Sequence, residues 1–200
     1  MFQLSVISDL IRVPPHLFHL PTDKAVLSEI NIKYANKVIP KLGLFVSVWD
    51  LIEIQDGLLK PGDGATFITV KFRGIIWKPF VGEVLTGWIK KNTPEGIKVT
   101  MEFFEDIFIP KSLLFENAVY SGDEDAWIWK PDDDTSLYLD ENEKIYFRIE
   151  EEVFTDIKPK GPDNSMNVTE EKESEENKVP PYAIIASCQT EGMGCVSWWE

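Results

Sequence analysis

Beyond residue 84 the chain consists of short stretches in which apolar and polar residues alternate, and this pattern restricts the possible fold more than any other feature. Ile97, Val99 and Met101 share one face of such a stretch, while Lys98 and Thr100 share the other. Further short strands are expected at 85–89, 107–110, 126–130, 144–154 and from residue 182, with a turn at 92–96. Five or six short strands with glycines at corners predict a small closed Greek-key barrel of the oligonucleotide-binding (OB) type.

The first 80 residues carry a different pattern, in which one helix stands among several strands. Alternation at Phe2, Leu4 and Val6 predicts a half-buried strand that the diproline at 14–15 ends. Thr22 is expected to cap a helix whose apolar residues recur every four positions; these are Val26, Ile30, Tyr34 and Val38. Strands at 42–54 and around 68–73 follow, the second with Ile68, Val70 and Phe72 on one face.

These patterns predict an α+β chain of two domains. Residues 1–80 have the order β-α-β-β, which is typical of one helix packed on a small antiparallel sheet. Residues 81–200 form the all-β barrel domain. Residues 158–181 hold no aromatic side chain and include the acidic run 170–176, so we expect a disordered acidic insertion between two strands of the barrel.

The net charge of −14 is unevenly distributed, which matters for nucleic-acid binding. Residues 1–115 hold 13 basic and 12 acidic side chains, whereas residues 116–157 alone hold 14 acidic and 3 basic side chains. Binding to a polyanion depends on Lys and Arg that neutralise phosphates. The first part of the chain is therefore compatible with RNA binding, while the acidic part is expected to be a solvated surface, to repel nucleic acid or to face a basic partner.

The sequence carries none of the motifs that mark common catalytic or nucleotide-binding sites. It lacks G-x-x-x-x-G-K, G-x-S-x-G and H-E-x-x-H, and its two cysteines and two histidines cannot build a zinc site. No stretch approaches the roughly 18 apolar residues of a membrane span. The loop 61–64 could bind a phosphate, but the absence of a following helix favours a tight turn. We expect a soluble intracellular protein that is not an enzyme and holds no metal or cofactor.

Candidate RNA contacts are the aromatic and basic side chains expected on the outer face of the barrel, because bases stack on rings and cations follow the phosphate backbone. The candidate RNA-binding residues are Trp88, Lys90, Lys91, Lys98 and Phe104. The pattern leaves open whether Trp88 stacks or packs in the core. Phe103 follows the apolar phase of residues 97–101 and is expected in the core, whereas Phe104 breaks that phase and is expected to be exposed.

Two tryptophan pairs require separate interpretations. Trp127 and Trp129 alternate on one face between acidic runs, and a packing role is favoured. Trp198 and Trp199, near the end of the chain, are either a terminal cap or a docking anchor, since an aromatic patch is costly to expose to water.

Several segments resemble one known family. The segments are Val70–Gly74, Lys78–Val84, the loop Pro61–Gly64, residues 94–110 and Ser197–Trp199. They are similar to the stalk subunit of archaeal and eukaryotic nuclear RNA polymerases, the counterpart of the seventh subunit of RNA polymerase II, and most like its RNA polymerase III branch. The resemblance covers essentially the whole chain and is weakest in the acidic insertion.

The resemblance implies a function without catalysis. It implies a truncated ribonucleoprotein-like N-terminal domain that docks on the polymerase core and binds a partner, followed by an S1-type OB barrel. It implies a heterodimer with a smaller helical stalk subunit, contact with initiation factors and weakly with nascent or single-stranded RNA, a role in transcription initiation and a location in the nucleus, with no membrane. By position, the core-docking residues would be Pro14, Pro15, Gly57, Pro61, Gly62, Asp63 and Gly64.

Two other functions remain open at this stage. One is a free-standing S1-domain RNA-binding protein in translation or RNA decay, and a weaker one is an enzyme. The acidic excess in 116–157 departs from a typical RNA-binding S1 domain and argues against strong or broad RNA affinity.

Overall fold

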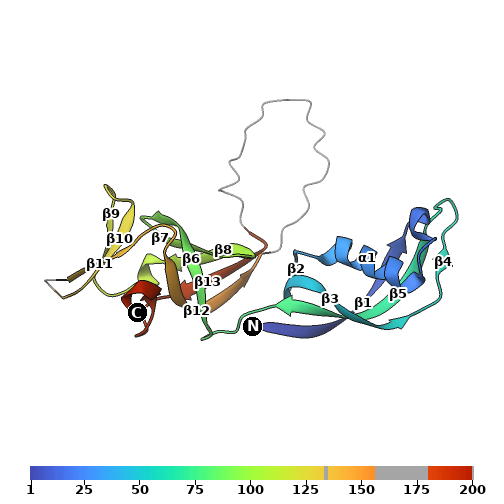
Figure 1. Cartoon of the computed structure of the whole chain (residues 1–200), viewed down its shortest axis with the longest axis horizontal. Coiled ribbons are helices and arrows are strands. Elements are labelled where there is room, and N and C mark those ends of the chain that lie inside the picture. The colour runs from blue at the N-terminus through green and yellow to red at the C-terminus, as the bar shows by residue number, and fades with distance from the viewer. Residues whose placement is uncertain (133–134, 156–179, 200) are drawn as a thin grey trace, which may run out of the picture. The chain divides into compact units, whose positions relative to one another are not determined.

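The computed structural model describes residues 1–132, 135–155 and 180–199, and the chain divides into two compact units, Met1–Pro79 and Phe80–Glu200 (Figure 1). The elements of the first unit are β1 (Phe2–Val13), the 3-10 helix η1 (Pro15–Leu17), α1 (Thr22–Tyr34), β2 (Lys37–Ile39), β3 (Gly43–Ile54), β4 (Leu58–Leu59) and β5 (Thr66–Trp77). The elements of the second unit are β6 (Val84–Thr93), β7 (Gly96–Met101), β8 (Phe104–Pro110), η2 (Lys111–Leu113), β9 (Ala118–Ser121), β10 (Ala126–Asp132), β11 (Thr135–Leu139), β12 (Lys144–Phe154), β13 (Tyr182–Ser187), β14 (Gly194–Cys195) and η4 (Val196–Trp198).

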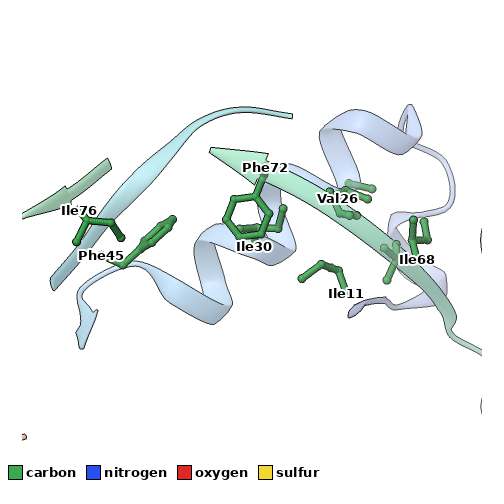
Figure 2. Packing of buried hydrophobic residues seen from close by; sticks show 10 residues of the cluster. Ile11, Val26, Ile30, Phe45, Ile68, Phe72 and Ile76 are labelled. Atoms are coloured by element: carbon green, nitrogen blue, oxygen red, sulfur yellow. The ribbon is translucent and has the colours of Figure 1, made fainter. Parts of the chain in front are cut away.

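The first unit is a five-stranded antiparallel sheet with α1 on one face. The strand order is β1-β5-β3-β2, and the short strand β4 pairs with β5. The core between α1 and the sheet joins Val26 and Ile30 of the helix to strand residues, among them Phe45, Ile68 and Phe72 (Figure 2). The expected helix on an antiparallel sheet is thus confirmed, and the short strands β2 and β4 are additions to it.

The helix begins one residue earlier and ends several residues earlier than the sequence predicts. Pro21, not Thr22, is the residue that precedes the first turn, and no side chain caps the helix there. At the other end the backbone leaves the helix at Ala35, whose ψ is 133°, and the left-handed Asn36, with a φ of 56°, directs the chain into β2. Val38 therefore lies in a strand, although its spacing continues the helical pattern.

In strand β1 the odd-numbered residues, not the even-numbered ones, face the core. Phe2, Leu4 and Val6 are exposed, whereas Ile11 and Val13 are in the core. The expected burial of the first three is wrong, because alternation shows which residues share a face but not which face a helix covers. Here α1 covers the face of Ile11.

The second unit contains a closed barrel, consistent with an OB fold. Its strands follow the order β12-β6-β7-β8-β13, and β13 pairs back with β12 to close the ring. The β13–β8 pair is parallel, and the remaining pairs in the ring are antiparallel. The predicted barrel is confirmed, with every strand expected at 85–89, 97–101, 107–110, 144–154 and 182 present.

A three-stranded sheet is attached to this barrel. Its order is β11-β10-β9, and only β10 was expected from the sequence. Trp127 of β10 is completely buried, and its indole N–H donates to the carbonyl of Thr93 in β6 at 3.0 Å. The packing role expected for Trp127 is confirmed, since this side chain joins the sheet to the barrel.

Most of the expected insertion at 158–181 lies outside the described residues. Its last two residues, Pro180 and Pro181, are described, and the carbonyl of Pro181 accepts a hydrogen bond from the amide of Thr155 at 3.0 Å.

Candidate nucleic-acid and docking surfaces

A β-bulge in β6 places two consecutive lysines on the outside of the barrel. Ile89 pairs with Val99, but the next pair along is Lys91 with Lys98, so Lys90 is the extra residue. Successive residues of a regular strand point to opposite faces, and a bulge interrupts this alternation. Lys90, Lys91 and Lys98 are all exposed as a result. The structure thus brings together the three lysines predicted to contact RNA.

Trp88 is half-buried, which answers the question that the sequence left open. Its ring faces the ammonium group of Lys144, which lies 5.9 Å from the ring centroid, and Lys144 is also its register partner on β12. The cation–π contact occupies one face of the ring. A base could therefore stack on Trp88 only on the remaining surface or after displacing Lys144.

Acidic side chains accompany the lysines. Lys90 forms an ion pair with Glu105 of β8. Burial raises the pKa of Asp106, and the neighbouring Glu105 raises it further, while Lys90 and Lys98 act in the opposite direction. These carboxylates reduce the positive potential of the lysine cluster, so the geometry supports weak rather than tight contact with a polyanion.

The exposures expected of Phe103 and Phe104 are wrong. Phe104 is only 6% exposed and packs on Tyr182, with the ring centroids 5.5 Å apart, whereas Phe103 is 42% exposed. The reason is the tight turn between β7 and β8. Glu102 and Phe103 form that turn and Met101 pairs with Phe104, so the alternation of β7 ends before Phe103. Phe103, not Phe104, is the aromatic residue that a ligand can reach.

The segments predicted to dock on a core complex lie together at one end of the first unit. We call this end the tip; it comprises Val13–Pro15 and the loop 56–65. The guanidinium of Arg12 donates two hydrogen bonds to the carboxylate of Asp63, at 3.1 and 2.9 Å. The same carboxylate accepts the amide of Ala65 at 3.1 Å, and these bonds together lower the pKa of Asp63. This bidentate pair ties the loop to the end of β1.

The glycines of the tip have different structural roles. Gly62 has a left-handed backbone with a φ of 84°, and nothing lies within 4 Å of where its Cβ would be. Gly64 is not in that region, and a Cβ there would touch the ring of Pro15 at an ordinary 3.4 Å. A Cβ on Gly57 would approach the Thr66 methyl to 2.3 Å. Gly62 therefore needs the conformational freedom of glycine, whereas the backbone of Gly64 does not.

The tip also exposes apolar surface. Leu58 and Leu59 of β4 are each 71% exposed, and Phe18, just after η1, is exposed as well. Beside them lies an open cavity of about 240 Å³, whose lining residues are Val13, Leu17, Phe18, Leu20, Thr22, Ala25, Thr66 and Ile68. Exposed apolar surface of this kind is typical of a protein-binding region.

A second apolar surface, which the sequence did not predict, follows β3. Three bulges interrupt its pairing with β5, and each adds one residue: Val46, Trp49 and Ile52. All three are exposed, Trp49 by 59%. Phe45, in contrast, belongs to the core, and Val48 and Leu51 pack against that core, so the bulges separate the two sets of side chains. We call Val46, Trp49 and Ile52 the β3 row. The recurrence of exposed apolar residues every three positions is the sequence signal that could have revealed this row.

An aromatic cluster lies at the end of the described chain. Trp129 stacks on Phe115, with centroids 4.3 Å apart, and on Trp198, with centroids 5.7 Å apart. Trp199 remains exposed, and its indole N–H donates to the carbonyl of Met193 at 3.2 Å. Trp129 and Trp198 are half-buried and have packing roles, whereas Trp199 is exposed.

The described residues offer little for metal or thiol chemistry. Cys188 and Cys195 are both buried free thiols, and burial raises the pKa of Cys188 to about 12. Within residues 1–132, 135–155 and 180–199, no three His, Cys, Asp or Glu side chains are grouped so that they could hold a metal ion. None of the helices in the same ranges is long and apolar enough to cross a membrane.

Comparison with known protein families gives two matches. Residues 83–199 match the family described as RNA polymerase III subunit Rpc25. Residues 8–64 match the SHS2 domain found in the N terminus of Rpb7p and Rpc25p. The two matches fall in the second and first units respectively.

Individual relatives match over all or part of their length. The chain is 50% identical over 212 residues to the DNA-directed RNA polymerase III subunit RPC8 of Saccharomyces cerevisiae, covering 100% of both chains. It is 36% identical to the subunit of the same name from Bos taurus, covering 100% of this chain and 98% of the relative. A more distant relative is the archaeal RNA polymerase subunit Rpo7 of Saccharolobus solfataricus, 32% identical over 50% of this chain and 56% of the relative.

Proposed function

The chain belongs to the family of the RNA polymerase III subunit Rpc25, and from this membership we propose that it is a non-catalytic stalk subunit of RNA polymerase III. The observation that carries the proposal is the 50% identity to a polymerase III subunit across the whole of both chains. The relatives that match over nearly their full length are polymerase subunits, which favours this function over a free-standing S1 protein. The chain would act in the nucleus, in transcription initiation.

In this proposal the tip is the part that docks on the polymerase core. The Arg12–Asp63 pair ties the loop to β1, and the strand β4, which carries Leu58 and Leu59, pairs with β5. Leu58 and Leu59 supply surface that a partner can bury, at roughly 25 cal/mol for each Å² removed from water. Polar side chains such as Asp63 surround this surface, as at other protein interfaces.

We assign the smaller helical stalk subunit to the β3 row. Val46, Trp49 and Ile52 form an exposed apolar row along β3, and an amphipathic helix has an apolar face that can pack on such a row. Exposed tryptophan is a frequent anchor in protein interfaces. The Asp50–Arg73 ion pair beside Trp49 would form part of the polar edge of that interface.

Single-stranded RNA is proposed to follow the outer face of the barrel at Lys90, Lys91 and Lys98, with Trp88 and Phe103 as stacking surfaces. Phe104 is removed from this set because it is buried. The accompanying Glu105 and Asp106 support weak binding with a strong dependence on salt.

Purification of the tagged full-length chain from cells tests the proposal. It should co-purify in stoichiometric amounts with a smaller helical protein and with the large catalytic subunits of RNA polymerase III. Leu58→Asp should reduce recovery of the catalytic subunits, whereas Val119→Asp, an equally drastic change at an exposed valine of the second unit, should not. Isolation of the wild-type chain as a stable monomer would contradict the proposal.

A further inference from the structure

Strand β1 is a long and regular edge of the sheet in the first unit. Among the described strands it pairs with β5 alone, in twelve consecutive pairs from Phe2–Trp77 to Val13–Thr66, without a bulge. Natural proteins usually protect such an edge with prolines, bulges, lysines or a covering element, because it can pair with another strand. Between Leu4 and Ser8 the sequence contains no proline and no charged residue.

The register shows which backbone groups point away from the sheet. The amide of Lys78 donates to the carbonyl of Met1 at 3.0 Å, so this pair is of the hydrogen-bonded type. Hydrogen-bonded and non-hydrogen-bonded pairs alternate along antiparallel strands. The even-numbered residues of β1 therefore direct their N–H and C=O groups outward, among them Leu4, Val6 and Ser8.

Asp9 limits the available edge at its far end. Its carboxylate accepts the amide of Leu10, the hydroxyl of Tyr34 and the ammonium of Lys33. Burial raises the pKa of Asp9, but these hydrogen bonds outweigh that effect and the pKa is lowered, so the carboxylate stays ionised. The edge with open backbone groups thus runs from Leu4 to Ser8.

The side chains along this edge specify the chemistry of a partner. Leu4 and Val6 are 50% and 56% exposed on the sheet face that α1 leaves uncovered. Ser8 is small and lies opposite Lys71 of β5, on the same face. Lys71 is exposed and, in the described part of the chain, forms no ion pair, although Glu53 is its register partner on β3. Strands lie about 4.8 Å apart, so a lysine can extend across Ser8 to a strand beyond β1.

We propose that β1 accepts an extended segment of another RNA polymerase III subunit as a sixth strand. The segment carries apolar side chains beside Leu4 and Val6 and a carboxylate beside Ser8, where it meets Lys71. Backbone hydrogen bonds give such strand addition its affinity, and the alternating side chains give it specificity. This inference rests on the proposed function, because it assumes that the chain enters the polymerase.

The test measures binding of full-length variants to purified RNA polymerase III that lacks this subunit. Val6→Pro removes an outward N–H without breaking a β5 hydrogen bond, and proline is tolerated at such edge positions. Val6→Thr keeps the N–H and is the matched control. Lys71→Glu reverses the charge, with Lys24→Glu on the exposed side of α1 as its control. Val6→Pro and Lys71→Glu should each weaken binding by about tenfold, as expected for loss of one good hydrogen bond or ion pair, and the controls should not.

Several results would overturn the inference. If the wild-type chain binds and Val6→Pro binds equally well, no strand is added at β1, whereas failure of the wild-type chain to bind contradicts the proposed function itself. A different result would assign the uncovered face of the sheet to RNA. In that case Lys71→Glu would lose oligouridylate binding, while Val6→Pro would bind both oligouridylate and the polymerase like the wild-type chain. A wild-type dimer in sedimentation that Val6→Pro dissolves would assign the edge to a second copy.

A cross-link keeps the inference testable if Val6→Pro does not fold. Benzoylphenylalanine placed at Ser8 in the assembled polymerase should attach to a segment of another subunit that alternates apolar residues and contains Asp or Glu. Attachment to a helix, to RNA or to nothing would contradict the added strand.

Discussion

Replacing Gly62 with valine should weaken attachment to the polymerase core far more than it weakens the fold. Gly62 has a φ of 84° with open space around its Cβ position, so the cost is backbone strain and not a steric clash. For a β-branched side chain that strain is about 1–3 kcal/mol. If the loop relaxes into another conformation, the docking-competent population falls by the corresponding factor, roughly 5-fold to 150-fold.

Two further variants make this prediction specific to the tip. Gly192→Val is the matched control, because Gly192 has a φ of 83°, equally open surroundings and a position in the second unit. Gly64→Val should be nearly neutral, since Gly64 is outside the left-handed region and its Cβ would make an ordinary contact with Pro15. The assay is a titration of each full-length variant, bound to the proposed smaller stalk subunit, against polymerase lacking the stalk. Equal losses for Gly62→Val and Gly192→Val, or none for Gly62→Val, would refute the reasoning.

Three other outcomes follow from the geometry. The hydrogen bonds from Arg12 and from a backbone amide lower the pKa of Asp63 in the folded protein. The ionised carboxylate therefore stabilises the fold above the unfolded carboxyl pKa of about 3.9, and this stabilisation is lost as the pH falls through the lower folded pKa. Thermal melts should therefore show Asp63→Asn as less stable than wild type near neutral pH, and this difference should shrink as the pH falls below about 3.9. Changing Lys90 and Lys91 together to Glu should abolish RNA binding and flatten its salt dependence in fluorescence anisotropy; unchanged affinity would move the RNA path elsewhere. Trp127→Phe should lower the free energy of unfolding by about 2 kcal/mol in urea titrations, because it removes the hydrogen bond to a β6 carbonyl and leaves a cavity. A change below about 0.5 kcal/mol would contradict the role of Trp127 in joining the three-stranded sheet to the barrel.

The spacing of apolar residues predicted the positions of most helices and strands correctly, but it did not show which face of a strand is buried. The helix and the barrel strands were predicted because their apolar spacing is regular, as at Ile97 and Val99. The outward face of β1 was assigned wrongly because nothing within Phe2–Val6 shows where α1 will lie. Such information comes from tertiary contacts between distant segments, which a local pattern does not contain.

The candidate site shows the same limit. The lysines at 90 and 91 were placed on the surface correctly, yet the bulge that exposes both depends on the partner strand β7. Phe103 and Phe104 were interchanged because a two-residue turn ends the alternation one step earlier than the apolar pattern suggests. The β3 row was missed because a strand is normally recognised by apolar residues at every second position. In β3 the three bulges make the exposed apolar residues recur at every third position.

Those bulges also affect which changes of length the first unit can tolerate. A deleted residue in a regular strand reverses the orientation of every side chain beyond it. Deletion of Trp49, however, would leave Val48 facing the core and Asp50 facing away, as in ordinary alternation, with the pairs to β5 preserved. The same holds at positions 46 and 52. Evolution can therefore shorten β3 by single residues at three places, removing an exposed apolar side chain each time while leaving the core in register.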